Sequence, residues 1–151
     1  MPGVPSLAQR AKGFKDVVAA KYRALNVAAD KVADGKPASV REIMKDLIAK
    51  DGDLRGVFAS DPITAEVVAQ AVSEKTTGDQ INIVAFGSEE NLVKLLQSDV
   101  IAGIVVEDPF RMGYDGVKTA LAASKGQTVS ANVDIGAILV TKANVSSVRS
   151  P

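Results

Sequence analysis

The stretch that decides the fold is IVVEDPFRMGYDGVKTAL, from Ile104 to Leu121. Residues 104–106 are apolar and predict a strand. Asp108 followed by Pro109 is typical of a helix start, with Asp as the N-cap and Pro as the first helical residue. Glu107 therefore stands at the carboxyl end of a strand. Ligands of open α/β sheets bind at that edge, so the motif indicates where a functional site would lie.

Apolar runs and helical patterns alternate along the rest of the chain. Strands are predicted at residues 24–28, 55–59, 81–86, 104–106, 128–133 and 137–141. Helices are predicted to begin at Ser6, Ser39, Pro62, Ser88 and Pro109. The three serines are the predicted N-caps of their helices, Ser39 as part of a capping box with Glu42, and the first helix is expected to span residues 6–21. The alternation predicts an α/β fold with a doubly wound, mostly parallel sheet, as a single lobe over residues 1–151.

The order of these elements is unusual because the pattern begins on a helix. In a flavodoxin-like sheet the first strand is central and precedes the first helix. Pro2, Gly3 and Pro5 argue against a strand before Ser6. We therefore expect the sheet to lack its first strand, which leaves strand edges unpaired. Either a segment from elsewhere fills the gap, or a second copy of the chain does so in a homo-oligomer.

Composition excludes several classes of function. Lys plus Arg number 18 and Asp plus Glu number 18, so zero net charge predicts no binding of nucleic acid or of an anionic membrane. The chain contains neither cysteine nor histidine, so a metal site would need oxygen ligands alone, and none is predicted. No apolar run approaches the roughly 20 residues that cross a bilayer.

Candidate binding residues lie where predicted strands end. Three strand-to-helix junctions carry polar residues or glycine, namely Ser60-Asp61, Gly87-Ser88 and Glu107-Asp108. Arg10, in the first predicted helix, can reach the same edge. Asp61, Asp108 and Ser88 could act as helix caps alone, and Arg10 could be a solvated helix charge. Glu107 has no capping duty, which favours a ligand role.

Catalytic patterns are poor. The serines have no histidine to activate them, and the chain has no G-x-S-x-G, Walker or G-x-G-x-x-G motif. Asp61 and Glu107 could form a carboxylate pair like that of a glycosidase, if their separation allowed it. We predict that the chain is not an enzyme and uses no cofactor. Phe14, Phe58 and Phe86 lie on apolar stripes and are expected in the core.

Several of these motifs occur together in one known family. The motifs are RAKGF at residues 10–14, GVFAS at 56–60, the strand at 83–86, VVEDPFRMGYDGVKTAL at 105–121 and IGAILVTKAN at 135–144. In order and spacing the chain resembles the sugar-type periplasmic solute-binding proteins of ABC transporters, the ribose-binding-protein-like family. Effector domains of lactose-repressor-type regulators share this lobe fold.

The resemblance implies two lobes, three hinge crossings and a sugar held between the lobes. This chain is similar to the C-terminal lobe, with the other lobe and a signal peptide expected upstream. A periplasmic location and a membrane permease as partner follow from the same resemblance. The alternatives are the effector core of a transcription regulator, which needs a helix-turn-helix upstream, and a self-associating module.

The resemblance also assigns ligand-binding positions. Arg10 matches the family's arginine, Asp61 a position often occupied by Asn, and Glu107 a position usually occupied by Gln. Gly87 falls where the family has Asp, so Ser88 would have to supply that acceptor. An aromatic residue that often follows the second strand is missing near residue 35. These departures predict a ligand other than a simple aldopentose or aldohexose, or a lobe whose binding has decayed.

Overall fold

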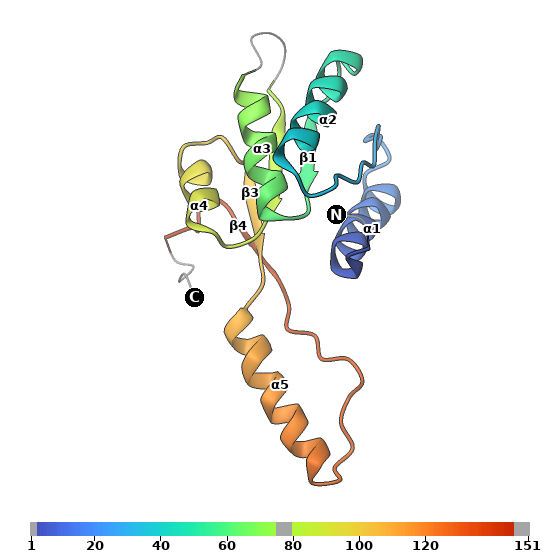
Figure 1. Ribbon diagram of the computed structural model, residues 1–151, viewed down its shortest axis with the longest axis vertical. Helices are drawn as coiled ribbons and strands as arrows, with labels where there is room; N and C mark the ends of the chain where they lie inside the picture. The colour runs from blue at the N-terminus through green and yellow to red at the C-terminus, as the bar shows by residue number, and fades with distance from the viewer. Residues whose placement is uncertain (1–2, 75–79, 147–151) are drawn as a thin grey trace.

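The computed structural model describes residues 3–74 and 80–146 (Figure 1). Within these residues one sheet has the neighbour order β1 (Gly56–Ala59), β2 (Asn82–Phe86), β3 (Gly103–Val106) and β4 (Ile138–Val140). The first three strands run parallel, and β4 runs antiparallel to β3. The predicted α/β fold with a mostly parallel sheet is therefore confirmed.

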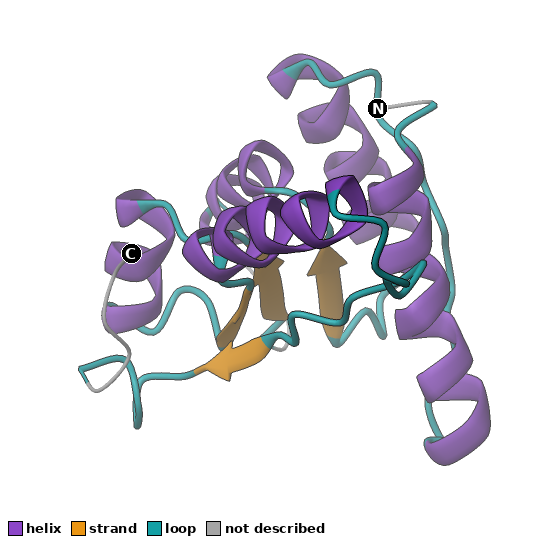
Figure 2. Cartoon of the chain, turned by 90° about the horizontal axis from the view of Figure 1, so that it is seen from below, coloured by secondary structure: helices purple, strands orange, loops and turns teal. Residues whose placement is uncertain are grey.

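Of the five helices in the described residues, three form a packed layer on the sheet and two lie outside that layer. They are α1 (Pro5–Lys21), α2 (Pro37–Lys50), α3 (Pro62–Ser73), α4 (Glu90–Gln97) and α5 (Pro109–Ser124). α3 packs on β1 and β2 and against α2 and α4. α1 lies beside the β1 end of the sheet, and α5 extends away beyond the carboxyl ends of the strands (Figures 1 and 2). None of the helices in residues 3–74 and 80–146 is long and apolar enough to cross a membrane.

The core lies between the sheet and the helices α3 and α4. Its largest side chains with less than 2% exposure are Ile83, Leu92, Leu96, Ile101, Ile104 and Val68. Burying an aliphatic side chain of this size contributes about 1.5–3 kcal/mol to stability. The core therefore holds the three parallel strands in fixed register and so fixes the edge at which they end.

Two predicted helix starts at that edge are confirmed. Asp61 caps α3, since its Oδ1 accepts a hydrogen bond of 2.9 Å from the Thr64 backbone N–H. Asp108 caps α5 in the same way, with Oδ1 2.9 Å from the Arg111 backbone nitrogen. Each carboxylate satisfies a backbone donor that the helix cannot satisfy itself.

The predicted caps Ser6 and Ser39 are wrong. α1 and α2 begin at Pro5 and Pro37, and neither N-cap residue makes a side-chain capping bond. Proline fixes a helical φ and has no N–H to satisfy, so it starts each helix before the serine. Ser39 instead donates its hydroxyl to Asp34 Oδ1 at 2.5 Å and to the Lys36 carbonyl at 3.1 Å.

The predicted cap Ser88 is wrong as well. Glu89 is the N-cap of α4, and its side chain makes no capping bond to the helix. Its carboxylate turns back and accepts a hydrogen bond of 2.9 Å from the Ser88 backbone N–H. The negative charge still lies at the positive end of the α4 dipole.

Two predicted strands are absent from the described part of the chain. Residues 24–28 and 128–133 carry the strand pattern but pair with no neighbour. A strand is stable only beside another strand, and β1 forms one end of the sheet with no described strand on its outer side. The predicted strand at 137–141 is confirmed as β4, Ile138–Val140.

The turn before α2 gives the fold an acid-sensitive contact. Asp34 accepts hydrogen bonds from the Ser39 hydroxyl and the Lys36 backbone N–H, which lower the pKa of its carboxyl below the usual value. A lowered folded-state pKa stabilises above the unfolded-state pKa of about 4, and this contribution is lost as the pH falls through the folded-state value.

We therefore expect Asp34→Asn to lower the melting temperature at pH 7 and to lower it less below pH 4. Thermal unfolding of both proteins across this pH range checks the expectation. Ser39→Ala is the matched variant, because it removes the main cause of the shift. A difference between Asp34→Asn and the unsubstituted protein that stays constant from pH 7 to pH 3 would contradict this account.

Candidate functional site

Arg10 lies at the centre of the candidate site. It stands on α1 one turn before Phe14, so the two side chains share a face of the helix. The Phe14 ring stacks on the Phe58 ring of β1 with 5.2 Å between centroids and 16° between planes. This stacking holds α1 against the sheet and brings Arg10 to the carboxyl ends of the strands.

The guanidinium of Arg10 contacts the ends of all three parallel strands. Its Nη1 donates to the Ser60 carbonyl at 3.0 Å, directly after β1. Its carbon Cζ lies 3.5 Å from the centroid of the Phe86 ring, the last residue of β2. A cation over an aromatic ring is stabilised by about 0.5–2 kcal/mol, more when it is shielded from water.

The third contact is an ion pair that follows β3. Arg10 Nη2 lies 3.4 Å from Glu107 Oε2, and the side chains are 22% and 36% exposed. The structure thus joins two predicted binding residues that are 97 positions apart in sequence. Their partial exposure leaves hydrogen-bonding atoms open to a ligand at this edge.

Asp61 lies at the same edge but serves its own helix. Besides the capping bond, its Oδ2 accepts a hydrogen bond of 2.7 Å from the Thr64 hydroxyl. Within the described residues Asp61 forms no hydrogen bond or ion pair with Arg10. The capping interpretation is confirmed for Asp61, and each oxygen keeps a lone pair for a further donor.

Gly87 and Ser88 form the β2 junction. Gly87 donates its N–H to the Val105 carbonyl at 3.1 Å and has φ of +144°, which side chains rarely adopt. A Cβ on Gly87 would lie 2.3 Å from Glu89 Oε2 and 2.7 Å from Pro62 Cγ. The backbone geometry, which spacing does not reveal, therefore accounts for glycine here. Ser88 is exposed.

Sequence reasoning missed the role of Phe86. It was expected in the core and is indeed 9% exposed, but its ring also supports the Arg10 guanidinium. The signal in the sequence for this role was that Phe86 ends a predicted strand directly before the Gly87 junction. The core prediction is wrong for Phe14, which is 41% exposed. Phe58 is partly buried beneath it.

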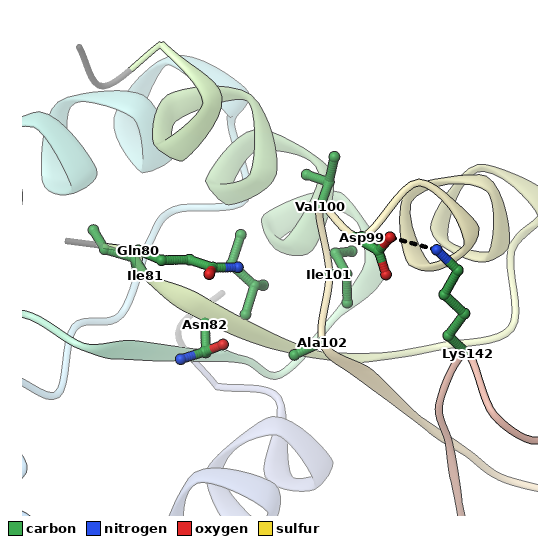
Figure 3. Close-up of a pocket in the computed structure, with 9 residues that line it drawn as sticks. Gln80, Ile81, Asn82, Asp99, Val100, Ile101, Ala102 and Lys142 are labelled. Carbon is green, nitrogen blue, oxygen red and sulfur yellow. Dashed lines mark hydrogen bonds and ion pairs between the residues drawn. The ribbon is translucent and has the colours of Figure 1, made fainter. Parts of the chain in front are cut away.

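The opposite edge of the sheet carries a separate hollow of about 180 Å³ (Figure 3). It lies where β2 and β3 begin, with Gln80, Asn82, Asp99 and Lys142 as its polar lining. Asp99 and Lys142 form an ion pair with each other, so this hollow offers no unmatched charge. Over the described ranges, no cluster of acidic side chains is arranged to hold a metal ion.

Comparison with known proteins identifies a family and related proteins. Residues 1–128 match the model of a family described as periplasmic binding protein domain. The chain is 29% identical over 133 residues to the ribose import binding protein of Haemophilus influenzae, covering 88% of this chain and 44% of that protein.

Two of the solved structures that match nearly all of the chain contain a bound sugar. A carbohydrate transporter solute-binding protein from Agrobacterium radiobacter, in complex with D-arabinose, is 52% identical, with a TM-score of 0.84. An ABC transporter solute-binding protein from Agrobacterium vitis, bound with α-D-tagatopyranose, is 28% identical, with a TM-score of 0.85. Each match covers 97% of this chain and 50% or 49% of the other, so the chain spans about half the length of these relatives.

Proposed function

Since the chain belongs to the family of periplasmic binding protein domains, we propose that it is one lobe of a two-lobed solute-binding protein that holds a sugar between its lobes. The observation that carries this proposal is the Arg10 cluster. One guanidinium joins the ends of three parallel strands, where α/β sheets bind ligands. Ligand would stabilise a closed arrangement of the lobes, which a membrane permease of an ABC transporter would recognise in the periplasm.

The exposed apolar residues of helix α5 support the proposal that the complete protein has a second lobe. Phe110, Tyr114, Val117 and Leu121 recur at spacings of four, three and four residues and form one stripe, with exposures of 77%, 60%, 73% and 54%. A stripe of this spacing faces a packing partner in helical proteins. In the described part of the chain α5 buries none of its residues. We propose that the stripe packs on the second lobe of the complete protein.

The chemistry of the edge supports a sugar ligand. Arg10 has N–H groups beyond those bonded to Ser60 and Glu107 and can donate them, while Glu107 and Asp61 can accept hydrogen bonds. A sugar hydroxyl both donates and accepts. The relative that is 52% identical was solved with D-arabinose, which makes this pentose the first ligand to test despite the expected departure from simple aldopentoses. The sequence contains no histidine that could activate a serine, which supports a binding protein over an enzyme.

The two rival hypotheses lead to different observations. The named relatives are import or transport components, which supports the transporter over the regulator core. Self-association would use the outer edge of β1, which no described strand covers. Gel filtration of the chain tests the self-association hypothesis, since a clean monomer would count against it.

A thermal-shift comparison tests the proposal. We expect D-arabinose, D-ribose or D-tagatose at millimolar concentration to raise the melting temperature of the complete protein by several degrees, through linkage of binding to folding. Residues 1–151 alone should show no comparable shift, because they supply one side of the site. A shift of several degrees for residues 1–151 alone would contradict the one-lobe proposal. No shift for either protein would contradict binding of these sugars.

A further inference from the structure

Carboxylates outnumber cations at the carboxyl edge of the sheet. Asp61, Glu89 and Asp108 are the N-cap residues of α3, α4 and α5. The positive end of each helix dipole, worth about half a charge, offsets part of each negative charge. Glu107 caps no helix, and in residues 3–74 and 80–146 its ion pair is with Arg10. Among the described side chains directly after β1, β2 and β3, carboxylates therefore outnumber cations.

Arg10, the cation that contacts the strand ends, makes three contacts within the protein and keeps further N–H donors for a ligand. Arg10 places Nη1 on the Ser60 carbonyl, Nη2 near Glu107 Oε2 and its face on Phe86. An anionic ligand that paired with the guanidinium would lie close to Glu107, whose Oε2 is 3.4 Å from Arg10 Nη2. Two negative charges would then lie side by side, and juxtaposed like charges are strongly unfavourable.

The second carboxylate oxygen of Glu107 is available to a ligand. Oε1 has no hydrogen-bond partner among the described residues, and the side chain is 36% exposed. An ionised carboxylate only accepts hydrogen bonds, so this oxygen can contact a hydroxyl or an ammonium group but not another carboxylate. A glutamine would present an amide that both donates and accepts, without the charge.

We propose that Glu107 determines specificity by charge: it binds a hydroxyl group of the ligand through Oε1 and excludes acidic sugars. This inference rests on the proposed function, because it concerns the ligand of the same site. It predicts that neutral monosaccharides bind and that their carboxylate counterparts do not. It also predicts that this discrimination depends on one side chain.

The experiment compares two matched pairs of ligands in the complete protein. Calorimetric titrations measure Kd for D-arabinose against D-arabinuronate, and for D-galactose against D-galacturonate. Each acid keeps a sugar ring and carries its carboxylate in place of the terminal CH₂OH group. The unsubstituted protein, Glu107→Gln and Glu42→Gln are titrated in parallel. Glu42 lies exposed on α2, so its substitution removes the same charge at a distance from the site.

We expect the unsubstituted protein and Glu42→Gln to bind a neutral sugar much more tightly than its acid. In Glu107→Gln the ratio of the two Kd values should fall by at least about tenfold, as the charge that repels the acid is lost. An unchanged ratio in Glu107→Gln, or equal binding of acid and neutral sugar by the unsubstituted protein, overturns this inference alone. Failure of D-arabinose, D-ribose and D-tagatose alike to bind contradicts the proposed function, and the inference falls with it.

Discussion

Replacing Arg10 by alanine is expected to weaken sugar binding by the complete protein by about 1.5–3 kcal/mol, or roughly 10- to 150-fold in Kd. The side chain reaches the ends of three strands, through the Ser60 carbonyl, the Phe86 ring and the Glu107 carboxylate. Its loss removes a donor to the ligand and leaves Glu107 without its cation. Titration calorimetry with D-arabinose measures the change.

Lys12→Ala is the matched control for this substitution. Lys12 lies on the same helix, is exposed and pairs with Asp16 at a distance of 2.5 Å. A surface pair of this kind contributes little, so its loss should leave both Kd and stability nearly unchanged. An unchanged Kd in a folded Arg10→Ala protein would remove Arg10 from the binding site.

Replacing Gly87 by alanine is expected to lower the free energy of unfolding by about 2–5 kcal/mol. The φ of +144° is one that an alanine rarely adopts, and the new Cβ would meet Glu89 Oε2 at 2.3 Å and Pro62 Cγ at 2.7 Å. The Glu89 side chain can rotate away. The proline ring, which starts α3, and the fully buried Leu92, 3.2 Å from the new Cβ, yield less easily.

Gly13→Ala provides the contrast. Gly13 lies inside α1, and a Cβ there would meet nothing within 4 Å. Alanine is favoured over glycine in a helix by up to about 1 kcal/mol, so this variant should be as stable as the unsubstituted protein or more so. Denaturant unfolding of both variants gives the comparison. Equal stability of the two variants would contradict the account of Gly87.

The sheet was predictable from sequence where each element carries its own signal. The β3 motif and the Asp-Pro helix starts at Asp61 and Asp108 depend on neighbouring residues and are confirmed. Residues 24–28 and 128–133 have the composition of strands, but a strand also needs a partner, and composition cannot supply it. Proline decided the starts of α1 and α2 ahead of the expected serines.

Part of the site was also predictable from the sequence. That strand ends meet at one edge follows from parallel topology, which predicted the place of Glu107. For Arg10 the sequence left two possibilities open, and the ion pair with Glu107 confirms that it reaches this edge. The support of Arg10 by Phe86, and the backbone angle that requires glycine at position 87, arise from tertiary geometry. Neither leaves a pattern along the chain, so both needed the structure.

Titration of the complete protein with D-arabinose tests the central claim most directly, because that claim is a sugar site built around Arg10 at the carboxyl edge. We predict saturable binding of one sugar per protein, with micromolar or tighter Kd, and a marked loss of affinity in Arg10→Ala. Absence of binding for D-arabinose, D-ribose and D-tagatose alike would contradict the account, as would sugar binding that Arg10→Ala leaves unchanged.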